Sequence, residues 1–226
     1  MASPKICVVI TAKNTAEALE RLTEVASQGP DLIEVRFDYM ESPGDPGIIR
    51  DSTDLPLIAT NRRRDQGGHS RMKEPERVAA ILDAVEAGFD YADLELNTPG
   101  LDNLGSRVKS LGGSLVISHH DFKGTPSAEE LRETMSRMVE RGADVCKIIG
   151  TAQSPGDNLT YLGLFGSPRE GGLVCFGMGR DGILSRVLSP LVGGEFTYAS
   201  SHAGGESAPG QLTLAEMREI YTLMGV

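Results

Sequence analysis

One charged residue, Lys147, lies inside an otherwise apolar run, Val145-Cys146-Lys147-Ile148-Ile149. Lysine is almost never fully buried without a purpose, and removing its ammonium from water lowers its pKa. A lysine that is partly neutral near pH 7 can attack a carbonyl carbon and form a Schiff base. The pattern therefore indicates a lysine nucleophile; the alternative is a structural lysine whose ion pair bridges neighbouring strands.

A pair of histidines ends another apolar run, in Ser118-His119-His120-Asp121. Side chains alternate between the two faces of a strand, so Ser118 and His120 share a face and His119 points to the other. An imidazole titrates near neutral pH and can serve as both acid and base. One of the two histidines is therefore expected to be a general acid–base group: alternation favours His120, His119 stays open, and the alternative for either is a purely structural histidine.

Two further strand candidates carry charged residues two positions apart. Glu34 and Arg36 share a face, where they could bind hydroxyl groups and position an acidic substrate, or form a buried structural ion pair, or do both. Asp93 and Glu95 also share a face. Neighbouring carboxylates raise each other's pKa unless cations lie close, so we expect these two to support the site rather than react.

Arginines occur near the predicted carboxyl ends of three strands, at Arg36, Arg62 and Arg186. Basic residues in loops are usually solvated. If they converge on one end of the sheet, however, these three would give the site a positively charged opening that is suited to a carboxylate substrate.

Two glycine-containing segments follow the last two strand candidates. Residues 177–182 match GxGxxG, a dinucleotide-binding pattern, but the chain that follows is too short to complete a dinucleotide domain. A glycine turn at this place in a barrel can bind other anions instead. The loop 201–211 is rich in Gly, Ser and Pro, which is typical of a connector or of a closing lid with Ser207 and Gln211 as hydrogen-bonding groups.

These side chains need a scaffold in which strands and helices alternate. Strands are predicted at 5–10, 31–37, 55–60, 90–96, 114–120, 144–149, 172–177 and 195–200. Helices are predicted at 14–27, 74–87, 100–111, 127–141, 158–166, 181–189 and 213–224, with a short or irregular helix within 39–53. Strict alternation indicates a parallel sheet, and the eight units predict one (β/α)₈ barrel (a TIM barrel) as a single domain over 1–226. A doubly wound open sheet is the alternative.

Composition restricts the functional classes. The net charge of −10 disfavours nucleic acid as a partner. The N-terminal apolar run 6–10 is too short for a signal peptide or a membrane span, so we expect a cytoplasmic protein without a membrane partner. Cys7, Cys146 and Cys175 lie in apolar runs without a CxxC pattern, which indicates buried, reduced thiols.

Six motifs follow one another along the chain: EVRFD at 34–38, Arg62 with Gly67-Gly68, SHHDF at 118–122, CKI at 146–148, MGRDGILSR at 178–186 and SAPGQ at 207–211. Together they resemble the type I 3-dehydroquinate dehydratase family. The resemblance implies a (β/α)₈ barrel, a homodimer, a small-molecule substrate and no metal or organic cofactor. It implies conversion of 3-dehydroquinate to 3-dehydroshikimate by syn elimination of water, in aromatic amino acid biosynthesis.

The resemblance also implies a role for each site residue. Lys147 would form the Schiff base, His120 would remove the proton next to the imine and then protonate the departing hydroxyl, and Arg186 would hold the substrate carboxylate. The other positions would contact the ring or its hydroxyl groups, shape the site or close it: Glu34, Arg36, Arg62, Met178, Ser207 and Gln211.

One position departs from the family pattern. Well-known members carry Glu before the Gly-Gly pair, where it is thought to orient the catalytic histidine, and this chain carries Gln66. An amide can hydrogen-bond an imidazole but cannot stabilise its cation by charge. Asp65, Gln66 and Glu95 therefore all stay open as the partner of His120.

Two other functions share part of this pattern. A class I aldolase on the same barrel would use Lys147 but would not require the SAPGQ motif or the His-Asp pair after the fifth strand. A non-catalytic binding protein would keep the fold and bind the substrate without turning it over.

Overall fold

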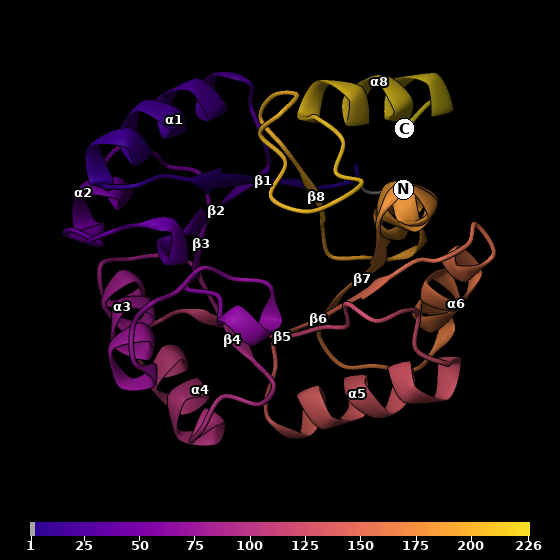
Figure 1. The fold of residues 1–226 in the computed structure, drawn as a ribbon, viewed down its shortest axis with the longest axis horizontal. Coiled ribbons are helices and arrows are strands. Elements are labelled where there is room, and N and C mark those ends of the chain that lie inside the picture. The colour runs from indigo at the N-terminus through magenta and orange to yellow at the C-terminus, as the bar shows by residue number, and fades with distance from the viewer. Residues whose placement is uncertain (1–2) are drawn as a thin grey trace.

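The computed structural model describes residues 3–226, and these form a barrel of parallel strands surrounded by helices (Figure 1). The strands are β1 (Ile6–Thr11), β2 (Leu32–Arg36), β3 (Leu57–Thr60), β4 (Tyr91–Glu95), β5 (Ser114–His120), β6 (Val145–Thr151), β7 (Gly172–Met178) and β8 (Thr197–Ala199). They pair in the order β7-β6-β5-β4-β3-β2-β1-β8. At the remaining seam, Glu195 N donates a hydrogen bond to Leu173 O at 2.9 Å. The predicted (β/α)₈ barrel is confirmed, and the open doubly wound sheet is wrong.

A helix follows each strand, as the alternation predicts. The helices are α1 (Thr15–Ser27), α2 (Pro46–Arg50), α3 (Glu74–Glu86), α4 (Leu101–Ser110), α5 (Ala128–Glu140), α6 (Asp157–Gly163), α7 (Ile183–Leu188) and α8 (Leu214–Met224). The second connection contains only the short α2, which fits its high Pro and Gly content. The seventh helix is shorter than predicted, because residues 180–182 and 189–192 form 3₁₀ turns at its two ends.

Local sequence signals explain where two of the helices begin. Ser127 and Thr213 each accept a hydrogen bond from the backbone N–H three residues on, and Glu130 and Glu216 bond back to the cap residue. These reciprocal bonds satisfy backbone donors that a helix start otherwise leaves free. They fix the first residues of α5 and α8, and so the points where the loops after β5 and β8 end.

Inward-facing strand positions change from apolar to polar toward the carboxyl end of the barrel. Apolar residues that include Cys7, Leu32, Val116, Val145, Val174 and Phe196 fill the interior as one cluster. Two positions further along the same faces, Leu32 is followed by Glu34, Val116 by Ser118 and Val145 by Lys147. A packed lower layer therefore supports an upper layer of polar groups, which is where barrel active sites lie.

The three cysteines are buried free thiols, as their apolar surroundings predict. Across residues 3–226, no helix has both the length and the apolar character needed to cross a membrane. In Figure 1, the segment around residues 64–66 and the loop that precedes α8 both lie in front of the strands, over the end of the barrel that faces the viewer. These two segments partly cover the polar upper layer.

Candidate active site

A cavity of about 180 Å³ lies at the carboxyl end of the barrel. Every residue that the sequence predicted for the site lines it: Glu34, Arg36, Arg62, Gln66, His120, Lys147, Met178, Arg186, Ser207 and Gln211. The structure therefore brings these residues together from five strands or strand ends, from helix α7 and from two loops, although they span most of the chain.

Lys147 lies at this cavity with only 4 % of its surface exposed. Its Nζ donates hydrogen bonds to Glu34 Oε2 at 3.1 Å, Asp93 Oδ2 at 2.9 Å and the Tyr198 hydroxyl at 2.8 Å. The lysine is thus buried and bridges strands through ion pairs, as the structural interpretation of its sequence pattern expects, and its role as a nucleophile stays a prediction. Attack on a carbonyl carbon requires the neutral amine with its lone pair, so reaction of an ammonium requires a route that takes a proton away.

His120 shares the inner face of β5 with Ser118, as the alternation predicts, while His119 lies on the opposite face. Burial is the largest cause that holds the pKa of His120 well below its usual range, and the cations of Arg62 and Lys147 add to it. The imidazole is therefore neutral near pH 7 and able to accept a proton. The ring of Phe122 lies nearly parallel to it, with centroids 6.2 Å apart.

The side chain of Gln66 contacts the backbone of His120 and makes no hydrogen bond to the imidazole ring. Gln66 Oε1 accepts a hydrogen bond from His120 N at 2.9 Å. The other two residues left open as partners are engaged elsewhere, since Asp65 pairs with Arg63 and Glu95 pairs with Arg62. Among the described residues, His120 Nδ1 is buried and has no hydrogen-bond partner.

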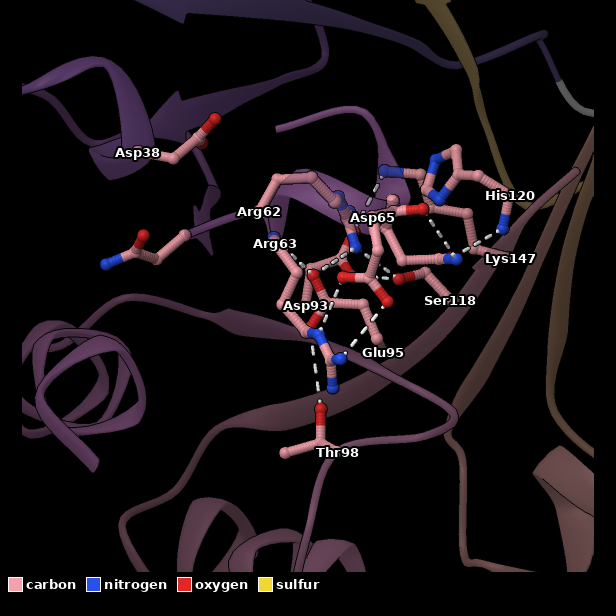
Figure 2. A network of polar contacts seen from close by, with 12 residues as sticks. Asp38, Arg62, Arg63, Asp65, Asp93, Glu95, Thr98, Ser118, His120 and Lys147 are labelled. Carbon is pink, nitrogen blue, oxygen red and sulfur yellow. Dashed lines mark hydrogen bonds and ion pairs between the residues drawn. The ribbon is translucent and has the colours of Figure 1, made fainter. Parts of the chain in front are cut away.

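A network of charged side chains adjoins Lys147 and holds Arg62 in place (Figure 2). The Arg62 guanidinium pairs with Asp93 at 2.5 Å and Glu95 at 3.2 Å, and it also donates to Ser118 Oγ. Burial acts to raise the pKa of Asp93, but Arg62 and Lys147 together hold it well below its usual range. Asp93 was expected only to support the site from its position beside Glu95, and its direct contact with Lys147 was not foreseen.

Arg186 is the buried cation that the protein leaves without a carboxylate. Within residues 3–226, the other buried Lys and Arg side chains all form ion pairs: Arg36 with Asp38, Arg62 with Asp93 and Glu95, Arg77 with Glu74 and Glu95, and Lys147 with Glu34 and Asp93. Arg186 is 1 % exposed and stacks over Phe176 at 4.3 Å. Its one hydrogen bond runs to Pro209 O at 3.5 Å, and burial lowers its pKa to about 10. All three arginines line the cavity as expected, but carboxylates of the protein already pair with Arg36 and Arg62, so the positive charge available to a ligand is that of Arg186.

The SAPGQ segment forms part of the cavity wall. Gln211 Oε1 accepts hydrogen bonds from Ser207 N at 2.8 Å and Ser207 Oγ at 3.2 Å, so the two predicted lid residues hold each other. Gly179 N donates to Pro209 O at 3.0 Å, which docks the segment on the turn after β7. The GxGxxG pattern belongs to this turn, where a side chain on Gly182 would collide with the backbone of Gly177. The glycines thus allow close backbone packing.

Tyr198 is a site residue that sequence reasoning did not single out. It points inward from β8, it is 5 % exposed and it lines the cavity. Its hydroxyl donates to Glu34 Oε2 at 2.6 Å and accepts from Lys147 Nζ. The available signal was a hydroxyl-bearing aromatic residue at the carboxyl end of an inward strand face, in the last strand before the lid loop.

The described residues hold no group of three or more His, Cys, Asp or Glu side chains arranged to bind a metal ion. The cavity combines a lysine amine, a neutral imidazole and one unpaired guanidinium. Such a set can form an imine with a ketone, move a proton at the adjacent carbon and bind a carboxylate.

Known proteins resemble this chain over nearly its whole length. The model of the type I 3-dehydroquinase family matches residues 6–226. A 3-dehydroquinate dehydratase of Dehalococcoides mccartyi (strain BAV1) is 39% identical over 222 residues, covering 98% of this chain and 96% of that protein.

Solved structures agree with this result. The 3-dehydroquinate dehydratase of Geobacillus kaustophilus superposes with a TM-score of 0.91 at 26% identity, covering 99% of this chain and 91% of that one. The type I enzyme of Clostridium difficile, solved with covalent modified comenic acid, gives 0.89 at 26% identity and covers 99% and 93%. The chain belongs to the type I 3-dehydroquinase family.

Proposed function

We propose that this protein is a 3-dehydroquinate dehydratase, a hydro-lyase of the shikimate pathway, and that it acts as one catalytic domain through an imine on Lys147. The observation that carries the proposal is a single cavity that holds the buried Lys147 amine, the neutral His120 ring and the unpaired Arg186 guanidinium. A substrate with a ketone, an acidic carbon next to it and a carboxylate matches these three groups.

The reaction follows from the chemistry of an iminium. Lys147 attacks the substrate ketone and water leaves, so that the carbon is joined to a positively charged nitrogen. This nitrogen withdraws electrons and acidifies the adjacent carbon, from which His120 removes a proton. The imidazolium then protonates the departing hydroxyl on the same face, which gives syn elimination. Hydrolysis of the imine releases 3-dehydroshikimate and restores the lysine.

The other cavity residues bind and enclose the ring. Arg186 pairs with the substrate carboxylate, for which a planar guanidinium is well suited. Glu34, Arg36 and Arg62 contact ring hydroxyl groups or hold the site in shape, and Met178 contacts the ring. Ser207 and Gln211 close the cavity from the SAPGQ segment, and Gln66 positions His120 through its main chain.

Neither alternative function gains support. The aldolase alternative shares Lys147, but the family match and the named relatives are dehydroquinases. The binding-protein alternative makes a different prediction for turnover. We further propose, from family resemblance, a homodimer in the cytoplasm. Light scattering on the purified protein tests the dimer, and cell fractionation tests the location.

The test combines turnover with covalent trapping. Product formation is followed by the absorbance of the conjugated product, and borohydride added with 3-dehydroquinate reduces the imine to a stable adduct on Lys147 that mass spectrometry detects. We expect Lys147→Ala to lose both adduct and turnover, and His120→Ala to keep the adduct but lose nearly all turnover. His119→Ala, on the other face of β5, is the control and should be much milder.

Three results would contradict the proposal. Rapid turnover by Lys147→Ala would exclude the imine mechanism. Activity on an aldol substrate, without an adduct from 3-dehydroquinate, would favour the aldolase. Binding of 3-dehydroquinate with no turnover by the wild-type protein would favour a non-catalytic role.

A further inference from the structure

The Lys147 ammonium, the Tyr198 hydroxyl and Glu34 Oε2 form a closed triangle of hydrogen bonds in the cavity. The three sides measure 2.8 Å from Nζ to the hydroxyl, 2.6 Å from the hydroxyl to Oε2, and 3.1 Å from Nζ to Oε2. The two sides that pass through the phenol are shorter than the direct one. We propose that Tyr198 relays protons from Lys147 to Glu34 while the imine forms, and in the reverse direction while the imine is hydrolysed.

The fold holds the phenol in this position. β1 lies between β8 and β2, so Tyr198 and Glu34 reach toward each other across the inward face that carries Cys7 and Val9. The small Cys7 and Val9 side chains leave room for the phenol ring. Phe196 contacts the ring edge-on with centroids 5.6 Å apart, and Lys147 Nζ lies 4.3 Å from the ring centre.

A relay must be able to accept one proton as it gives up another, without remaining charged. Burial is the largest cause that holds the pKa of Tyr198 well above its usual range, and Glu34 adds to it. The phenol therefore stays neutral and does not act as a stored base. Its oxygen accepts from Lys147 while its proton already points to Glu34, which is the arrangement that a relay requires.

Asp93 also contacts Lys147, at 2.9 Å, but it is a poor destination for a proton. Its Oδ2 pairs with Arg62, and its Oδ1 accepts from Ser118 Oγ at 2.6 Å. These partners hold the aspartate in its ionised form. Glu34 lines the cavity and has no arginine among its ion pairs in the described residues, so it is the better acceptor.

The step balances in protons and electrons. An N–H bond of the Lys147 ammonium breaks and its proton joins the phenol oxygen, while the phenol proton passes to Glu34 Oε2. This leaves a neutral amine with a lone pair, an unchanged tyrosine and a neutral carboxylic acid. The amine then attacks the ketone, and Glu34 supplies the proton to the substrate oxygen. A second passage moves a second proton from nitrogen to oxygen, so that the oxygen leaves as water and an iminium remains.

The inference rests on the proposed imine chemistry, and Tyr198→Phe tests it, because this variant keeps the ring and loses only the hydroxyl. We expect the adduct on Lys147 to form about 10- to 100-fold more slowly, less than the full loss of a general acid–base group, because direct transfer over 3.1 Å remains. With 3-dehydroquinate deuterated at the carbon that loses its proton, the isotope effect on kcat should fall toward one, since imine formation or hydrolysis then limits the rate.

Tyr221→Phe is the matched control. Tyr221 is a buried tyrosine whose hydroxyl donates to Val187 O at 2.8 Å, and neither of these two residues lines the cavity. The control loses the one buried hydrogen bond of its hydroxyl, whereas Tyr198→Phe loses two, and it should leave adduct formation and the isotope effect unchanged. A Tyr198→Phe protein that matches wild type in adduct rate and isotope effect overturns the relay.

A second comparison separates the relay from a loss of local order. Glu34→Gln cannot accept the proton, so the double variant Tyr198→Phe/Glu34→Gln should form the adduct no more slowly than Glu34→Gln alone. Independent, multiplied losses would overturn the relay. A wild-type protein that forms no adduct with 3-dehydroquinate overturns the proposed function and the relay together, whereas an active wild type matched by Tyr198→Phe overturns the relay alone.

Discussion

Replacing Arg186 with methionine should make the free protein more stable and the enzyme much weaker. The guanidinium is 1 % exposed, it lacks a carboxylate partner in the described residues, and burial lowers its pKa to about 10. Burial holds the pKa of this guanidinium well below its ordinary value, and each pH unit of that lowering corresponds to about 1.4 kcal/mol, so burial of the charge costs ~3 kcal/mol. Methionine keeps much of the apolar stem and removes that cost.

The sign of the effect at neutral pH follows from proton binding. The folded protein binds this proton less tightly than the unfolded chain does, so the cost is fully present at any pH well below 10. The substrate carboxylate brings the missing opposite charge and recovers a similar free energy. Without Arg186, kcat/KM should fall by about a hundredfold or more, because ~3 kcal/mol corresponds to somewhat over two powers of ten.

Arg77→Met is the matched control for stability. Arg77 is equally buried, but it pairs with Glu95 at 3.0 Å and with Glu74 at 2.8 Å. Its replacement leaves the buried Glu95 with one cation fewer and should destabilise the protein by about 3–5 kcal/mol. Chemical denaturation compares the two variants at one pH, and the absorbance assay gives kcat/KM.

A substrate analogue completes the test. An amide of 3-dehydroquinate lacks the carboxylate charge. With wild-type protein its kcat/KM should be far below that of 3-dehydroquinate, whereas with Arg186→Met the two compounds should have similar kcat/KM values. The reasoning is refuted if Arg186→Met is destabilised as much as Arg77→Met, or if its kcat/KM stays within about threefold of wild type.

Two further predictions concern His120. The pKa of His120 in the folded protein lies below its ordinary value of 6.5, so the unfolded chain binds a proton first as the pH falls. The free energy of unfolding should therefore decline below pH 6.5, and it should decline less steeply in His120→Gln. Parallel slopes for the two proteins in denaturation series from pH 7 to 5 would contradict this. Gln66→Glu places a carboxylate near an imidazole that lacks a ring partner, so the acidic limb of kcat/KM should move to higher pH by about one unit or more. Gln66→Ala, which adds no charge, should not produce that upward shift, and an unchanged profile in Gln66→Glu would show that the new carboxylate does not reach the ring.

Much of the barrel could be predicted because its information is local. Alternation along β5 put His120 on the inner face and His119 on the outer one, and the capping boxes at Ser127 and Thr213 set the starts of two helices. An isolated charge in the apolar β6 identified Lys147. Each of these signals lies within a few residues, so neighbouring side chains and backbone bonds decide it.

The partners of these residues could not be predicted in the same way. Lys147 meets Glu34, Asp93 and Tyr198 across 113, 54 and 51 residues of chain. The positions of Arg36, Arg62 and Arg186 along the chain say nothing of their partners, and the structure shows that the first two are paired with carboxylates whereas Arg186 has none among the described residues.

The sequence by itself determined the alternating elements, the face of each strand residue and the presence of a buried amine and an imidazole at one end of a barrel. Tertiary structure alone decided which charges neutralise one another, that Gln66 binds the His120 backbone, and that a tyrosine joins Lys147 to Glu34. The physical reason is the range of the interactions. Strand periodicity is set by adjacent residues, whereas hydrogen bonds and ion pairs depend on distances of about 3 Å that only the closure and stagger of the whole barrel establish.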